Sequence, residues 1–142
     1  MTAIGLETAE IIVDTALSKG REMKLAPLTV AVLDPGGHLV ALKREDGSGI
    51  LRTEIAMGKA WGALGMGFNS RELGERAQKM PSFFAALGAA SGGRMIPVPG
   101  GVLILGQDKK VLGAVGISGD TSDNDEICGL AGISAAGLET PK

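Results

Sequence analysis

Cysteine, histidine and aromatic residues are scarce in this chain of 142 residues. It contains one cysteine, one histidine, one tryptophan, three phenylalanines and no tyrosine. A single cysteine excludes an intrachain disulfide bond. The scarcity of aromatic rings disfavours nucleic-acid binding, because single-stranded nucleic acids are held largely by base stacking on aromatic or arginine side chains.

Long charged runs and long apolar runs are also missing. The formal net charge is −2, and no basic stretch would direct the protein to nucleic acid or to an anionic membrane. No apolar segment approaches the roughly 20 residues that cross a bilayer. The first 14 residues lack a basic region and include Glu7 and Glu10, so we predict no signal peptide and a cytoplasmic location.

Glycine, in contrast, is abundant. The chain has 23 glycines, about twice the average usage of ~7%. Its length predicts a single domain over residues 1–142. With 44% hydrophobic residues but few aromatic ones, we expect an aliphatic core that is tightly packed and rich in small residues.

The hydrophobic pattern predicts an alternation of helices with β-hairpins. Helices are expected over 6–23, 51–67, 71–79, 82–90 and 123–137, and strands over 28–33, 38–43, 102–105 and 110–117. The first strand is nearly all apolar, so we expect it to be central with both faces covered. Asp34-Pro35-Gly36-Gly37 has the composition of a tight turn. Short connections favour an antiparallel sheet, an α+β arrangement covered by helices.

His38, the only histidine, directly follows this turn. One interpretation is a histidine at the edge of the hairpin that faces solvent. The other is an axial ligand of haem, because haem needs only one strong ligand from the protein. Cys128 lies in the last predicted helix beside Ile127 and Leu130, which favours a buried core thiol.

Lys59 lies in a helix that is rich in glycine and alanine. It either bonds strand-end carbonyl groups or a carboxylate inside the fold, or it presents a cation to a ligand. If the protein is an enzyme, Lys59 or Arg44 could hold a substrate carboxylate and Asp125 could act as the base, which makes Lys59 and Asp125 the catalytic candidates. Otherwise we expect Arg44 to pair locally with Asp46.

Three kinds of motif that mark catalytic or nucleotide-binding sites are missing. There is no nucleophile elbow or oriented serine triad, no Walker loop, and no glycine fingerprint at a strand-to-helix turn.

The turn from Ser118 to Ser122 precedes a helix, where backbone amides can bind an anion. The acidic residues that follow, including Asp120 and Asp125, favour an acidic helix cap instead.

Several glycine-containing blocks, in this order and spacing, resemble the GlcG/HbpS family, also called the haem-degrading or PduO C-terminal-like domain. The resemblance extends from about Leu6 to Gly137, and the blocks that carry it are Val32–Gly37, Arg44–Gly47, Ile55–Ala60, Pro99–Gly101 and Gly116–Gly119 followed by Asp125. It implies a profilin-like fold, with a five-stranded antiparallel sheet sandwiched between helical layers. It also implies a homo-oligomer.

The resemblance implies that a small molecule is bound, with haem or a related tetrapyrrole as the leading ligand. In the haem-binding relatives the axial histidine lies in the first helix, and here that helix contains none, so His38 is the possible axial ligand. The candidate ligand-binding residues are His38, Arg44, Lys59, Gly100, Gly101, Ser118, Gly119 and Asp120.

Two other functions remain open. One is a catabolic enzyme that acts on a small organic acid in a glycolate- or aromatic-type pathway. The other is an oligomeric accessory subunit without catalysis. No nucleic-acid or membrane partner is expected from the sequence.

Overall fold

The computed structural model describes all residues from Met1 to Lys142. Five helices and four strands follow one another in an α+β order. The elements are α1 (Leu6–Glu22), β1 (Thr29–Leu33), β2 (Leu39–Arg44), α2 (Arg52–Met66), α3 (Ser70–Lys79), α4 (Pro81–Ala90), β3 (Gly101–Leu105), β4 (Val111–Ser118) and α5 (Ser122–Ala135). None of the helices combines the length and apolar character that a membrane span requires.

The strands form one antiparallel sheet in the order β2-β1-β4-β3. The prediction that the first strand is central is confirmed, because all five residues of β1 are buried. The sheet has four strands, so the expectation of five strands is wrong. Pro97 and Pro99 precede β3 and have no N–H group to donate to a sheet, and this segment lies outside the strands.

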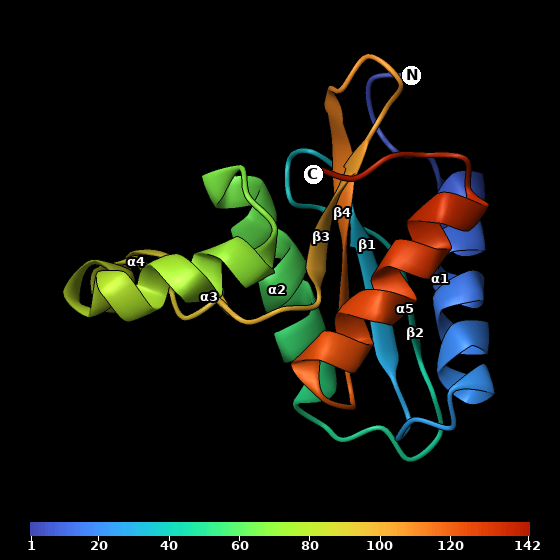
Figure 1. Cartoon of the computed structure of the whole chain (residues 1–142), viewed down its shortest axis with the longest axis horizontal. Coiled ribbons are helices and arrows are strands. Elements are labelled where there is room, and N and C mark those ends of the chain that lie inside the picture. Colours follow the sequence, from blue (N-terminus) through green and yellow to red (C-terminus); the bar gives the residue numbers. More distant parts are fainter.

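Helices cover both faces of the sheet (Figure 1). α1 and α5 lie side by side on one face, and α2 lies on the other. Side chains alternate between the faces along each strand. Val102 and Ile104 of β3 belong to the core beneath α1 and α5, whereas Leu103 and Leu105 belong to the core beneath α2.

Small residues bring α2 close to the sheet. A side chain at Gly116 of β4 would overlap the carbonyl oxygen of Ala56, and one at Gly101 of β3 would overlap that of Lys59. Glycine is therefore required at both positions because helix and sheet are in backbone contact. This contact fixes where the side chains of α2 lie relative to β3 and β4.

α3 and α4 project from the α2 side of the sheet as an arm (Figure 1). The base of the arm is a small apolar cluster of Leu73, Phe84 and Met95. Phe84 is the only buried residue of α4. The chain then returns to α2, where the N–H of Ile96 donates to the carbonyl of Gly58 at 3.2 Å.

Candidate functional site

Lys59 and Asp125 form a buried ion pair between α2 and α5. The ammonium Nζ lies 3.2 Å from Asp125 Oδ2 and donates to the carbonyl of Ile117 at 2.8 Å. Only 2% of the Lys59 side chain and 1% of the Asp125 side chain are exposed. The interpretation that Lys59 bonds a strand-end carbonyl and a carboxylate is confirmed.

The neighbouring glycines close the space around this pair. A side chain at Gly100 would lie 2.8 Å from Lys59 Nζ and 2.9 Å from the carbonyl of Ile117. Burial lowers the pKa of Lys59, while the Asp125 carboxylate opposes that shift. Both side chains of the pair are almost completely withdrawn from solvent. The pair is therefore sealed from a ligand and is placed to connect α2, β4 and α5.

The polar groups of the turn from Ser118 to Asp120 are also hydrogen-bonded to other parts of the protein. Ser118 Oγ accepts from Arg52 Nη1 at 3.0 Å. Asp120 accepts from Asn124 Nδ2 at 2.8 Å and from the backbone of Ala26 at 3.0 Å, and these bonds lower its pKa. Its own N–H donates to Asp125 Oδ1 at 3.0 Å.

Gly119 has no side chain, and this allows the turn to lie close to the start of β1. A side chain at Gly119 would overlap the carbonyl oxygen of Pro27. Of the acidic residues that follow, Asp123 and Glu126 pair with Arg71 of α3 at the surface. The turn thus joins the α1–β1 connection to the beginning of α5.

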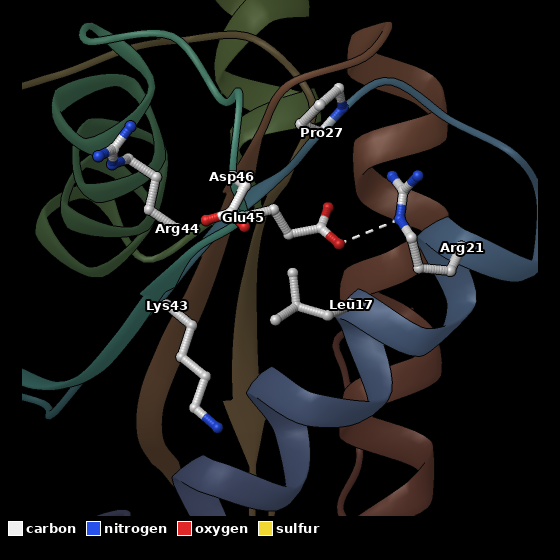
Figure 2. Close-up of a pocket in the computed structure, with 7 residues that line it drawn as sticks. All are labelled: Leu17, Arg21, Pro27, Lys43, Arg44, Glu45 and Asp46. Atoms are coloured by element: carbon white, nitrogen blue, oxygen red, sulfur yellow. Dashed lines mark ion pairs between the residues drawn. The ribbon is translucent and has the colours of Figure 1, made fainter.

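Arg44 lies elsewhere, at the outer edge of the sheet. It lines a shallow groove of about 610 Å³ with Arg21 and Glu45 (Figure 2). The expected Arg44–Asp46 pair is wrong: Arg44 Nη1 donates to the carbonyl of Ser48 at 2.9 Å, and the ion pair in the groove joins Arg21 to Glu45 at 3.0 Å. The side chain of Arg44 points away from that pair. The structure does not bring Arg44 together with Lys59.

His38 is at the tip of the β1–β2 hairpin, with 81% of its side chain exposed. Its Nδ1 lies 3.2 Å from Asp34 Oδ1 and 3.3 Å from Oδ2. The backbone N–H groups of His38 and Gly36 also donate to Asp34, and with the imidazole they lower the pKa of that carboxyl group. Nε2 has no hydrogen-bond partner within the protein.

A cavity of about 290 Å³ lies next to this hairpin, and we call it the Trp61 cavity. It is bounded by α2, the end of β1 and the loop after α4, and its lining residues are Leu33, Glu54, Met57, Gly58, Trp61, Gly92, Gly93 and Arg94. The Asp34–His38 turn borders it, because Leu33 lines the cavity and a side chain at Gly37 would lie 3.0 Å from the Trp61 ring. His38 is not part of the lining.

Sequence reasoning missed the Trp61 cavity. The available signals were the only tryptophan of the chain, placed in the glycine-rich helix, and the pair Gly92-Gly93 before an arginine. Neither signal shows that the loop after α4 returns to α2, so Trp61 and Arg94 could not be placed together.

Cys128 is buried in the core between α1, α5 and the sheet. Burial, followed by the negative charge of Asp125, raises the pKa of its thiol to about 11. The reactive form of cysteine is the thiolate, which is rare at neutral pH when the pKa is this high. The interpretation of Cys128 as a buried core thiol is confirmed.

The fold thus defines an α+β protein in which helices cover both faces of a four-stranded antiparallel sheet, with a small cavity beside one hairpin. A sequence model of the family described as haem degrading protein, HbpS-like, matches residues 4–134. The chain therefore belongs to the HbpS-like family.

Individual proteins are also similar to this chain. An uncharacterised 15.0 kDa protein of Citrobacter freundii, from the dhaT–dhaS intergenic region, is 26% identical over 127 residues, which are 89% of this chain and 87% of that protein. The crystal structure of a PduOC–haem complex is similar in fold, with a TM-score of 0.88, 22% identity and 99% of both chains covered. Klebsiella pneumoniae protein ORFY has a TM-score of 0.88 at 24% identity, with 96% of this chain and 92% of that chain covered.

Proposed function

We propose that this protein binds haem or a related tetrapyrrole through His38. Membership of the HbpS-like family supports this proposal, as does the likeness in fold to a protein whose crystal structure is a haem complex. Haem, when bound, would supply the chemistry of its iron. The residues of this chain would supply the imidazole, its orientation and an apolar surface.

The observation that carries the proposal is the pairing of His38 with Asp34. A carboxylate acceptor at Nδ1 favours the tautomer in which Nδ1 carries the proton. The lone pair is then on Nε2, which is the unpartnered and exposed nitrogen. Carboxylate groups orient metal-binding histidines in this way and increase their basicity. Asp34 is thus a positioning residue for His38.

The Trp61 cavity supplies apolar surface beside the same hairpin. Leu33, Met57 and Trp61 are its hydrophobic lining residues. With about 290 Å³, it is at the lower limit of the ~300–1,000 Å³ that is usual for ligand pockets. One chain would therefore enclose a porphyrin only in part, and the exposed His38 is compatible with a ligand held at the surface.

Haemin titration of the purified protein tests the proposal. We expect a saturable, red-shifted Soret band that disappears in His38→Ala, and an affinity that is ~10-fold or more lower in Asp34→Asn, because the imidazole loses its orienting partner. The exposed Lys79→Ala variant is the control and should bind as the wild type does. No saturable change would overturn the haem proposal. A band that persists in His38→Ala would overturn the assignment of the axial ligand.

We also propose that the protein is a homo-oligomer and that a second copy covers α4. No charged residue occurs from Met80 to Gly93, and 48% of Phe83 is exposed. Helices that are apolar on all sides are usually buried.

The cytoplasmic location stays a prediction from the sequence.

Sedimentation velocity at several protein concentrations measures the oligomeric state. We expect an oligomer for the wild type and for Phe83→Leu, which preserves the apolar surface. Phe83→Glu should shift the population towards monomer, because a charge in an apolar contact is costly to desolvate. A monomeric wild type, or a Phe83→Glu variant of unchanged mass, would contradict this arrangement.

A further inference from the structure

The Trp61 cavity has a charged group beside its apolar surface, and the haem proposal uses only the apolar surface. Three apolar side chains form one part of it, and a single arginine stands at its edge. We propose that this cavity also binds a small, planar aromatic carboxylate, such as a benzoate-type ion, and that binding there does not need His38.

The apolar part of the cavity suits a flat ring. Leu33 is buried, whereas Met57 and Trp61 are only partly buried and present surface to the cavity. An aromatic ring gains from offset or edge-on contact with the Trp61 indole and from contact with the Met57 sulfur. A volume of about 290 Å³ accommodates a single substituted ring and is small for a tetrapyrrole.

Arg94 supplies the charge that fixes the carboxylate. Its guanidinium carbon lies 4.1 Å from the centre of the Trp61 ring, and Nε donates to the carbonyl of Ser91 at 2.7 Å. Arg94 has no ion pair and no other side-chain hydrogen bond in the protein. Its two terminal nitrogens are therefore available, and their planar arrangement matches the two oxygens of a carboxylate.

The position of Arg94 is set by the packing of its loop on α2. A side chain at Gly58 would lie 2.5 Å from the carbonyl oxygen of Arg94 and 2.5 Å from the Ile96 side chain. The backbone bond from Ile96 to Gly58 holds the loop at this close approach. Stacking on Trp61 then limits the rotamers of Arg94, so less side-chain entropy is lost when it binds an anion.

Glu54 is the only acidic residue in the lining. Its side chain is exposed, so its repulsion of a bound carboxylate is weakened by water and salt. The repulsion still opposes binding. We therefore expect the two charges to affect the affinity for a carboxylate in opposite ways. Removing the charge of Glu54 strengthens binding, and removing that of Arg94 weakens it.

Trp61 is a built-in probe of this site. It is the only tryptophan, and the chain has no tyrosine, so fluorescence excited near 295 nm reports on this cavity alone. We would titrate the full chain with benzoate and compare it with benzyl alcohol, acetate and cyclohexanecarboxylate. Benzoate is expected to cause a saturable change. The probes that lack either the charge or the planar ring should bind about tenfold or more weakly, because each loses one of the two contacts.

Variants separate carboxylate binding from haem binding. Because removing Arg94 changes the environment of Trp61 directly, affinities of the variants are measured by calorimetry. We expect Arg94→Gln to weaken benzoate binding at least tenfold, Arg94→Lys to weaken it less, and Glu54→Gln to strengthen it. His38→Ala should leave it unchanged. Equal binding of benzoate and benzyl alcohol, equal binding to Arg94→Gln, or loss of benzoate binding in His38→Ala would overturn the proposal. All of these titrations use the haem-free protein, so none of the results depends on whether haem binds.

Discussion

Replacing Lys59 with methionine is expected to destabilise the protein by about 3–5 kcal/mol, the usual cost of leaving one member of a buried ion pair alone. Methionine preserves much of the side-chain volume, so the loss comes mainly from the Asp125 carboxylate. That group would stay buried without its cation. The carbonyl of Ile117 would also lose the bond from Nζ. Urea unfolding measures the difference, and the m-value shows whether the transition is otherwise unchanged.

The surface pair Lys43–Asp14 provides a matched control. It joins the same two residue types at 2.8 Å, but 53% and 58% of the side chains are exposed. We expect Lys43→Met to change the free energy of unfolding far less than Lys59→Met does, because exposed ion pairs contribute little. The double variant Lys59→Met, Asp125→Leu should recover part of the stability lost in the single variant, since both buried charges are then removed together.

The same experiment distinguishes the two interpretations of Lys59. Residues that are held for catalysis or binding often reduce stability, so their replacement preserves or increases it. A Lys59→Met variant as stable as the wild type would therefore contradict the structural role of the pair. It would also revive the hypothesis of an enzyme that uses Lys59 and Asp125 on a small organic acid.

The elements of this fold were predicted well because their signals are local. The helix expected over 51–67 is Arg52–Met66, and the strand expected over 38–43 is Leu39–Arg44. Apolar periodicity and turn residues determine such elements within a few positions. The number of strands rested on the resemblance to a family instead. Beside the edge strand β3, the chain makes only an isolated bridge between Leu105 and Glu139, so no fifth strand forms.

The sequence indicated individual residues of the candidate site but not how they are arranged. Lys59 and Asp125 were each singled out, but their pairing depends on how α2 and α5 pack against the end of β4. Arg44 was grouped with Lys59, although β2 is the edge strand and directs Arg44 to another surface. The Trp61 cavity depends on a loop that returns to α2 after the whole α3–α4 arm. No local pattern encodes such a contact.

Among substitutions that add one methyl group to the sheet, Gly116→Ala is expected to reduce the stability of the protein most. The added carbon would overlap the carbonyl oxygen of Ala56 and lie 3.1 Å from the side chain of Ala60. Both obstacles belong to α2, which would have to move away from β4. We expect a loss of about 3 kcal/mol, at the upper end of the ~1–3 kcal/mol usual for overpacking.

Gly65→Ala is the control, because Gly65 lies in α2 but faces open space. It is exposed within α2, and no atom lies within 4 Å of an added side-chain carbon. Alanine restricts the unfolded chain and favours the helix, so we expect a gain of roughly 0.5–1 kcal/mol. Thermal and urea unfolding of both variants check the prediction. A Gly116→Ala variant as stable as the wild type would mean that α2 is not in backbone contact with β4. Lys59 and Trp61, which belong to α2, would then lie at positions other than those described above.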